Sequence, residues 1–144
     1  MKLHQLSLFL ENRPGHLLNA CRTLANAGIN VETMALSDTE QFGILRILVK
    51  EWERAKKVFE DKGIWVKVTE VIAAKTPNRP GGLADLLEQV AKIGLNVEYM
   101  YGFDSMVLNS ALLVLRFDDP DKALRLLTEN GVEIVGESEL FQNK

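Results

Sequence analysis

The sequence predicts an α+β protein in which two β-α-β-β-α-β units follow one another along the chain. Three observations carry this prediction. The chain has 144 residues, a block of its first half recurs in its second half, and its apolar residues switch between the spacing of strands and that of helices. A chain of this length forms one ordinary domain or two small ones. Units of about 70 residues are marginal alone, so we expect the two to pack against each other.

The repeat is the strongest signal in the sequence. Asn12-Arg13-Pro14-Gly15 recurs as Asn78-Arg79-Pro80-Gly81, and the alignment continues without a gap, with eleven identities over the 23 positions 12–34. Self-similarity of this kind marks duplicated structural units. We therefore predict a first domain over residues 1–68 and a second over residues 69–144.

The offset between the two copies changes farther along the chain. It is 66 residues at the first motif and 68 residues at two later matches, Ala55 with Ala123 and Gly63 with Gly131. The second copy has therefore gained two residues, and we place this insertion near Asp118-Asp119-Pro120.

The first copy opens with a strand and a helix. Apolar residues alternate from Leu6 to Leu10, as in a half-buried strand, and Pro14-Gly15 ends the strand. Gly28 stands where a helix ends on a residue in the left-handed conformation. Between these points the inward stripe of a helix has apolar side chains at helical spacing, namely Leu17, Leu18, Cys21, Leu24 and Ala25.

The remaining elements of the first copy complete the order β-α-β-β-α-β. In sequence we expect a strand at Val31–Leu36, a turn at Asp38–Gln41, a strand at Phe42–Val49, a helix from Trp52 that stops at Gly63, and a strand from Ile64. Two β-α-β halves with both helices on one face of the sheet make a ferredoxin-like sandwich.

The second copy repeats this order. We expect a strand near Val71–Ala74, a helix with Leu83, Leu86, Leu87, Val90 and Ala91 inward, strands at Val97–Phe103 and Ala111–Phe117, a helix from Pro120, and a last strand near Glu133–Leu140. Asp119 and Pro120 make an N-cap and first-turn pair. Since no flexible tether separates the copies, and strand sequence runs almost continuously from Ile64 to Lys75, we expect the units to be locked side by side.

Composition excludes several classes of protein. Twenty acidic and 17 basic residues give a net charge of −3, without the basic footprint of a nucleic-acid-binding protein. The one cysteine forms no internal disulfide, so nothing demands an oxidising compartment. The N-terminal apolar run is short and alternates with polar residues, unlike a signal peptide. No run approaches the roughly 20 apolar residues of a membrane span, and we expect a cytoplasmic protein.

The repeated Asn-Arg-Pro-Gly segment is a candidate anion site, because it joins a strand to the start of a helix. Backbone N–H groups in the first turn of a helix lack internal partners, and the helix dipole places partial positive charge there. Gly15 carries no side chain that would keep a ligand away from the backbone. The amide of Asn12 offers a donor and an acceptor beside the turn, and Asn30 could offer a second amide across an interface.

A purely structural interpretation stays open beside this one. Pro-Gly at the start of a helix is common punctuation, Asn12 could serve only to cap the turn, and Gly-x-Asn after a helix is ordinary loop chemistry. Recurrence of all these residues in both copies favours a function, although duplicated folds also preserve structural turns.

These motifs resemble those of the ACT domain. The resemblance rests on Glu11-Asn12-Arg13-Pro14-Gly15-His16-Leu17 followed by Gly28-Ile29-Asn30-Val31-Glu32, and on Asn78-Arg79-Pro80-Gly81-Gly82-Leu83 with Gly94-Leu95-Asn96-Val97-Glu98. It covers both copies and is closest in character to the ACT copy in the regulatory small subunit of acetolactate synthase. The resemblance implies a regulatory module that binds an amino acid where two such domains pack side by side.

The resemblance also implies which residues bind the ligand. The four asparagines would contact its polar ends, and backbone at the helix starts would hold its carboxylate. The implied ligand-binding set is Asn12, Gly15, His16, Leu17, Asn30 and Val31 in the first copy, and Asn78, Gly81, Gly82, Leu83, Asn96 and Val97 in the second.

Three residues that could carry chemistry are assigned more modest roles. Cys21 lies on the inward stripe and aligns with Leu87, so we interpret it as a small core side chain. His16 aligns with Gly82 and is either structural or a selectivity residue of the first copy alone. The scattered histidines and single cysteine predict no metal site, and no cofactor is implied.

Val97, Tyr99, Tyr101 and Phe103 alternate on one predicted strand face and could stack bases in an RNA-recognition domain of this topology. The net negative charge and the absence of aromatic alternation on the strand from Phe42 argue against RNA, so we interpret the ladder as a sheet-packing or dimer surface. No catalytic constellation recurs in both copies. Acylphosphatase, which shares the topology and uses an arginine and an asparagine, stays open as a minor alternative through Arg13 and Asn30.

The sequence therefore predicts a stand-alone tandem ACT protein that is not an enzyme. We expect it to bind a free amino acid between ACT domains, to form a homodimer by analogy with the fold, and to pass a conformational change to a partner such as a regulated enzyme. It is expected to bind neither nucleic acid nor membrane. The alternative is a protein-interaction module of the same fold that binds no ligand.

Overall fold

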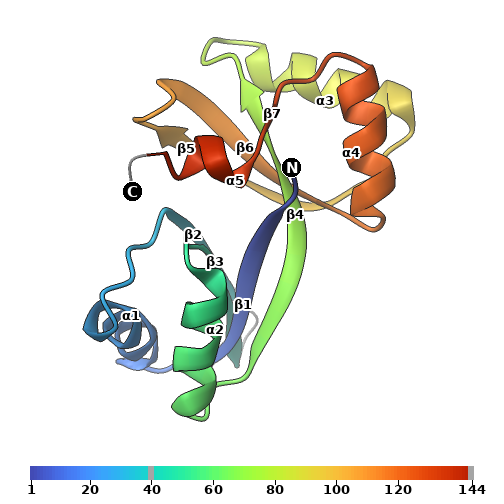
Figure 1. Ribbon diagram of the computed structural model, residues 1–144. Coiled ribbons are helices and arrows are strands. Elements are labelled where there is room, and N and C mark those ends of the chain that lie inside the picture. Colours follow the sequence, from blue (N-terminus) through green and yellow to red (C-terminus); the bar gives the residue numbers. More distant parts are fainter. Residues whose placement is uncertain (39–40, 143–144) are drawn as a thin grey trace. The chain divides into compact units, whose positions relative to one another are not determined.

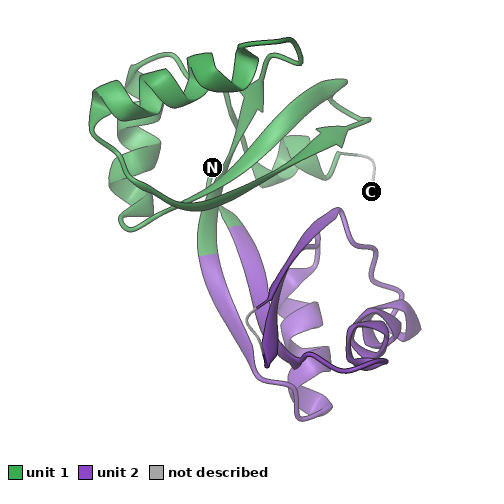
Figure 2. Cartoon of the chain, turned by 180° about the vertical axis from the view of Figure 1, so that it is seen from behind, with its two compact units in different colours: residues 1–3, 70–144 green, residues 4–69 purple. Residues whose placement is uncertain are grey.

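The computed structural model describes residues 1–38 and 41–142, and its chain divides into two compact units. Unit 2 is His4–Thr69, and unit 1 is Met1–Leu3 with Glu70–Lys144 (Figure 2). The turn predicted at Asp38–Gln41 includes Thr39 and Glu40, which lie outside the described residues. The division into domains at residues 68 and 69 and the side-by-side packing of the copies stay predictions.

Unit 2 has the predicted order of elements. They are β1 (Leu3–Glu11), α1 (His16–Asn26), β2 (Thr33–Asp38), β3 (Phe42–Leu48), α2 (Trp52–Asp61) and the first residues of β4 (Val66–Thr76) (Figure 1). The strands lie in the order β2-β3-β1-β4, and β3 is antiparallel to both β1 and β2. The ferredoxin-like arrangement is therefore confirmed in this copy.

Unit 1 repeats the arrangement. Its elements are the rest of β4, then α3 (Gly82–Ile93), β5 (Val97–Ser105), β6 (Ser110–Phe117), α4 (Pro120–Glu129), β7 (Ile134–Val135) and a short α5 (Glu137–Leu140). β4 is antiparallel to β6 and to β7, and β5 is antiparallel to β6. β4 is one unbroken strand, which confirms the continuity predicted between Ile64 and Lys75.

Each unit has its own apolar core between one face of its sheet and both of its helices. In unit 2, Leu24 of α1 and Phe59 of α2 join strand residues such as Leu45 in one buried cluster. In unit 1, Val90 of α3 and Leu127 of α4 do the same. Because burial of apolar area is the main favourable term in folding, these two clusters hold each helix pair on its sheet.

The long helices end alike, on a glycine in the left-handed conformation. After α1, the N–H of Gly28 donates to Ala25 O at 3.0 Å and the N–H of Ile29 donates to Leu24 O at 3.0 Å, which is a Schellman motif. Gly28 has φ 70°, as predicted, and Gly63, Gly94 and Gly131 follow α2, α3 and α4 with the same sign of φ. Only glycine adopts this conformation without a steric cost.

The two-residue insertion lies elsewhere than predicted. Asp38 pairs with Gly43 in unit 2, and the equivalent Asp104 pairs with Ala111 in unit 1, so the offset has already reached 68 residues when β6 begins. The extra residues are therefore in the β5–β6 hairpin and not near Asp118-Asp119-Pro120. Sparse identity between the copies over this stretch leaves the gap free to slide in a sequence alignment, and pairing between strands removes that freedom.

The last predicted strand is largely wrong. Only Ile134–Val135 pairs with β4, and the chain then turns at Gly136 into the helical residues Glu137–Leu140. The segment has adjacent apolar residues followed by Glu-Ser-Glu, and it lacks the alternation of a half-buried strand. Leu140 and Phe141 are buried at the end of this short helix.

The inward stripes of α1 and α3 are only partly as predicted. On α1 the buried side chains are Ala20, Thr23 and Leu24, while Leu17, Leu18 and Ala25 are exposed and Cys21 is half-buried. On α3, Leu86 and Val90 are buried, Leu87 is half-buried, and Leu83 and Ala91 are exposed. The apolar sector of each helix is broader than the sector that faces the sheet, so periodicity alone places the buried stripe too far to one side.

A β-bulge breaks the aromatic ladder expected on β5. The register shifts between Val97 and Tyr99, so Val97 packs against the core of unit 1. Tyr101 and Phe103 pair with Val114 and Leu112 on the opposite face of the strand. An extra residue in one strand reverses the side of the sheet on which the preceding side chain lies.

The predicted N-cap of α4 provides the first test. Asp119 accepts a hydrogen bond from the N–H of Lys122 at 3.1 Å, and Pro120 begins the helix. We expect Asp119→Ala to lower the free energy of unfolding by about 1 kcal/mol, because a first-turn N–H loses its acceptor. Asp119→Asn keeps an acceptor and should change little. Urea denaturation followed by circular dichroism measures both, and equal stability of the two variants would contradict the assignment.

Candidate functional site

The repeated turn has the same backbone hydrogen bonds in both copies. In the first, the N–H of Arg13 donates to Glu11 O at 2.8 Å and that of His16 to Arg13 O at 3.3 Å. In the second, Arg79 donates to Pro77 O and Gly82 to Arg79 O, each at 3.0 Å. The motif therefore encodes one defined turn, twice.

A glycine in the left-handed conformation stands immediately before each first helix. Gly15 has φ 88° and Gly81 has φ 86°, and neither provides a side-chain cap. Among the described residues, the N–H groups of Leu17 and Leu18 in α1, and of Leu83 and Ala84 in α3, meet no acceptor. The first turn of each helix therefore keeps free donors at its positive end.

The space above these glycines is open. A Cβ added at Gly15 would meet no atom within 4 Å, and one at Gly81 would meet only Arg79 Nη1 at 3.7 Å. The amide side chains of Asn12 and Asn78 are exposed and form no hydrogen bond with other described residues. A small anion or zwitterion therefore has access to the turn in each copy.

The turn asparagine and the strand asparagine of one unit lie at opposite ends of its sheet. β1 ends at Glu11, which pairs with Phe42 at the start of β3, whereas Thr33, soon after Asn30, pairs with Leu48 at the end of β3. At about 3.3 Å per residue these ends are roughly 20 Å apart.

Unit 1 has the same geometry. Thr76, close to Asn78, pairs with Ala111 at the start of β6, and Val97, next to Asn96, pairs with Phe117 at its end. Within either unit, the structure therefore does not bring the two predicted asparagines to one ligand. The neighbouring Val31 and Val97 pack against the cores of their units.

The helix-start residues differ between the copies for a steric reason. A Cβ on Gly82 would lie 2.0 Å from Pro77 O, so the second copy accepts no side chain there, whereas His16 takes the equivalent position in the first copy and is half-buried. Of the two interpretations of this position, the structure supplies a steric cause for the glycine.

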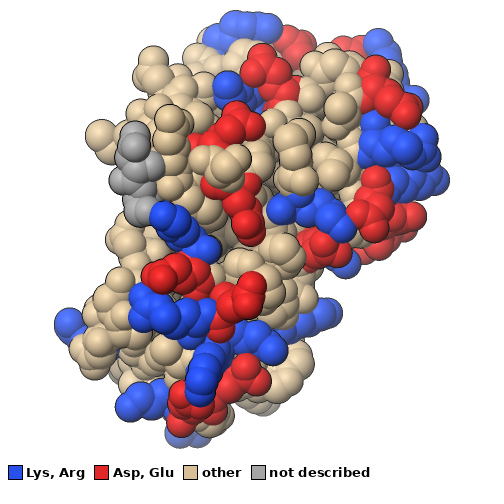
Figure 3. Space-filling model, in the orientation of Figure 1, with Lys and Arg blue, Asp and Glu red and all other residues tan. Residues whose placement is uncertain are grey.

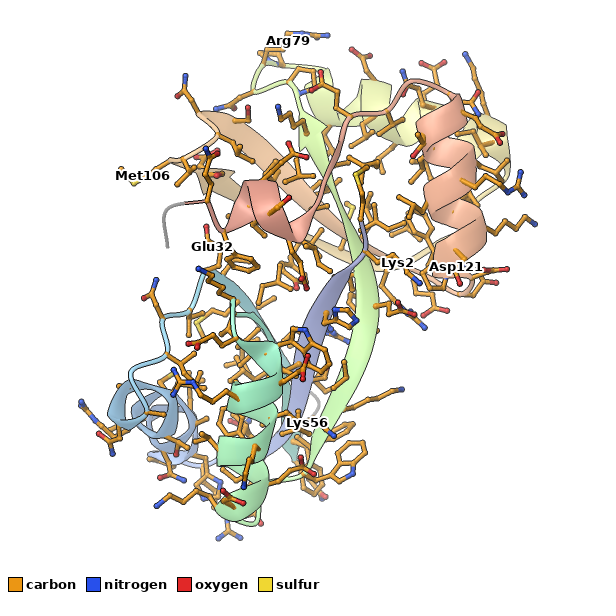
Figure 4. The ribbon with its side chains drawn as sticks, in the orientation of Figure 1. Lys2, Glu32, Lys56, Arg79, Met106 and Asp121 are labelled. Atoms are coloured by element: carbon orange, nitrogen blue, oxygen red, sulfur yellow. The ribbon has the colours of Figure 1, made fainter. Side chains whose placement is uncertain are left out.

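A cavity of about 810 Å³ lies inside unit 1, beside the second turn. It is lined by the end of β4, the turn residues Asn78 and Arg79, the inner side of α3, the β5–β6 hairpin and the residues that lead into β7. Arg79 and Met106, labelled in Figure 4, mark the turn and the hairpin. The volume is within the usual range of about 300–1,000 Å³ for small-molecule sites.

Charged side chains face this cavity in pairs. Lys75 Nζ lies 3.4 Å from Glu133 Oε2, and Arg79 Nη2 lies 2.8 Å from Asp85 Oδ2. A third carboxylate, that of Asp104, makes no ion pair with any described residue. Sequence reasoning found the turn residues and missed Lys75, Asp104 and Glu133. The signal that could have revealed two of these is that Lys75 and Glu133 replace aromatic residues of the first copy.

A smaller groove of about 330 Å³ runs between the start of α3 and β5. Leu83 and Gly102 line it, together with neighbouring residues of β6. The residue equivalent to Gly102 in the first copy is Leu36, whose Cδ1 would lie 3.2 Å from a Cβ at Gly43. The glycine therefore opens in the second copy a space that a leucine occupies in the first.

The described residues contain no group of His, Cys, Asp and Glu side chains placed to hold a metal ion. No helix in the described part of the chain is long and apolar enough to cross a membrane. On the face shown in Figure 3, basic and acidic side chains are interspersed without a broad patch of one sign.

Comparison with known proteins places the chain in context. The family model for the ACT domain pair matches residues 1–143. Protein BT0572 from Bacteroides thetaiotaomicron is similar at 35% identity, with a TM-score of 0.89 over 99% of this chain and 97% of that one. The search of curated proteins found no match.

Two distant structures share the fold. They are the regulatory subunits of aspartate kinase from Thermus thermophilus, in its ligand-free form, and from Thermus flavus. Both are 16% identical, with TM-scores of 0.62 and 0.61, over 91% and 90% of this chain and 94% and 92% of theirs. The finer similarity to the acetolactate synthase copy stays a prediction from the motif.

The contact at Gly82 gives a sharp test of the turn. Gly82→Ala forces a methyl group against the carbonyl of Pro77, and we expect it to lower the free energy of unfolding by about 3 kcal/mol. The matched variant His16→Ala in the first copy should change it by less than about 1 kcal/mol. Urea denaturation of both proteins measures the difference, and a neutral Gly82→Ala would show that the turn is looser than described.

Proposed function

We propose that this chain, which belongs to the ACT domain pair family, is a regulatory module that binds a free amino acid and passes a conformational change to a partner. The observation that carries the proposal is the repeated turn, with free N–H donors, an open left-handed glycine and an exposed asparagine in both copies. The shared fold of the two Thermus regulatory subunits is a precedent at the level of fold alone.

The chemistry of the turn suits an amino acid. Its carboxylate would accept hydrogen bonds from the first-turn N–H groups at the positive end of the helix. Its ammonium group would donate to the side-chain oxygen of Asn12 or Asn78, which have no other partner among the described residues. Gly15 and Gly81 leave the backbone accessible to a ligand of this size.

The distance between the asparagines suggests how binding could be coupled to a structural change. One amino acid is too small to span the roughly 20 Å between Asn12 and Asn30 of one unit. An asparagine of the second set would therefore come from a different ACT domain, which a second copy of the chain supplies in a homodimer. A ligand that bridges two domains favours the packing in which both contact it.

In this proposal the chain regulates and does not catalyse. The turn offers hydrogen-bond donors and amides, which orient a ligand, and no nucleophile with an adjacent base. The output passes to a partner, for which a regulated enzyme is the natural candidate. The regulated partner and the amino acid are to be identified by experiment.

A second candidate function has one specific observation in its favour. In unit 2, Phe9 and Trp65 stack with ring centroids 5.6 Å apart and remain 53% and 62% exposed. Large exposed aromatic side chains are enriched at protein interfaces. A protein-interaction module that binds no amino acid is therefore the alternative.

A panel of the twenty amino acids distinguishes the two functions. We expect at least one, at millimolar concentration, to raise the melting temperature of the wild-type protein, because a ligand that binds only the folded state stabilises it. Asn78→Ala or Asn12→Ala should weaken its affinity about tenfold by removing one hydrogen bond to a charged group. Differential scanning fluorimetry provides the screen and isothermal titration calorimetry the affinities.

Asn26→Ala is the matched control, since Asn26 is an exposed asparagine at the far end of α1 from the turn. It should leave the affinity unchanged. Stabilisation by none of the twenty amino acids would favour the interaction module. Unchanged affinity in both turn variants would remove the turns as the site.

A further inference from the structure

We propose that the cavity of unit 1 is a self-contained site for one amino acid with a polar side chain, and that the first copy has no counterpart of it. The inference rests on the proposed function, and it names the copy that binds and the class of ligand. All the residues that line the cavity belong to the stretch from Lys75 to Glu133. Unit 1 therefore supplies the walls of this site by itself.

The charges of the cavity suit a zwitterion. Lys75 and Arg79 each lie beside a carboxylate, that of Glu133 or of Asp85, whereas the carboxylate of Asp104 makes no ion pair with a described residue. Acidic groups therefore exceed basic ones, and the ammonium group of a ligand has an anchor in Asp104. The ligand carboxylate then binds Lys75 or Arg79, whose positive charges lie on the other walls.

The remaining walls favour a polar side chain. Hydroxyl and amide groups of Thr76, Gln89, Ser105 and Ser110 line the cavity. The Thr76 hydroxyl is buried and has no hydrogen-bond partner among the described residues. An apolar side chain would remove water from these groups without replacing its hydrogen bonds, which is unfavourable. A side chain with its own donors and acceptors replaces them.

The first copy is built differently at the equivalent positions. Phe9 takes the place of Lys75, and Trp65 takes the place of Glu133. The two aromatic rings stack on each other where the second copy has its ion pair. A zwitterion finds no charged partner at this point of unit 2.

The longer hairpin is the second difference between the copies. The two inserted residues lie between Asp104 and Ala111, and four residues of this hairpin, Ser105, Met106, Asn109 and Ser110, line the cavity. The insertion thus extends one wall of the cavity in the copy that also carries the ion pair. Charged walls and an extended rim occur together in the second copy, as expected for a binding site.

Asp104→Asn tests the proposal with little risk to folding, because Asp104 is exposed and makes no ion pair with a described residue. Its matched control is Asp38→Asn, the equivalent position of the first copy. Calorimetric titration of the full chain with the best amino acid from the panel should give one site per chain. Asp104→Asn should weaken affinity at least tenfold, and Asp38→Asn less than twofold.

Two further measurements complete the experiment. Lys75→Phe with Glu133→Trp gives the second copy the residues of the first and should abolish binding, with circular dichroism as the check on folding. In the panel, amino acids with charged, amide or hydroxyl side chains should stabilise the wild-type protein more than Leu, Ile, Val and Phe do.

The possible failures are distinguishable. Two sites per chain, equal effects of Asp104→Asn and Asp38→Asn, or a preference for apolar amino acids would each overturn this inference and leave the proposed function standing. Binding that depends on Asn12 and Asn78 alike and ignores Asp104 would locate the ligand at the turns. If no amino acid binds the wild-type protein, the inference and the proposed function both fail.

Discussion

A glycine in the left-handed conformation between the first strand and the first helix is the constraint on which each unit depends. Gly15 and Gly81 turn the chain so that the helix returns across its sheet, and a side chain at such a φ would be strained. The same turn leaves the first N–H groups of the helix without acceptors. One backbone conformation therefore gives both the direction of the helix that completes the core and the partial positive charge that makes the turn a binding site.

Duplication turns each unit into a control for the other. Where both copies keep a residue, as at Asn12 and Asn78, the shared turn geometry gives it a common role, either structural or in binding. Where they differ, the frame is the same and the difference is local. The exchange of Phe9 and Trp65 for Lys75 and Glu133 changes the chemistry at one end of a sheet from aromatic stacking to paired charges without altering the strands that carry it. Such an exchange allows the two copies to serve different functions on one fold.

Much of the fold could be predicted because strong local signals agree with it. Alternation marks β1, glycines end the four long helices, and Asp119 caps α4 as its sequence indicates. The failures have a common cause, which is that tertiary pairing decides them. The buried face of α1 depends on where the sheet lies, the side of Val97 depends on a bulge, and Glu137–Leu140 forms a helix because its apolar residues do not alternate. Of the candidate site, sequence reasoning found the turns, because they recur, and missed Asp104, which is charged but carries no motif.

The position of the inserted residues connects fold to function. Placed near Asp118-Asp119-Pro120, an insertion would lengthen only the approach to α4 and touch no site. Strand register places it in the β5–β6 hairpin, beside the cavity, where Ser105 is buried and its Oγ accepts a hydrogen bond from Leu108 N–H at 3.2 Å. A hairpin two residues longer extends one side of the sheet past its end, toward the turn that carries Asn78 and Arg79. The cavity therefore exists in the copy whose hairpin is long enough to wall it, and the ion pair of β4 gives that wall a charged counterpart.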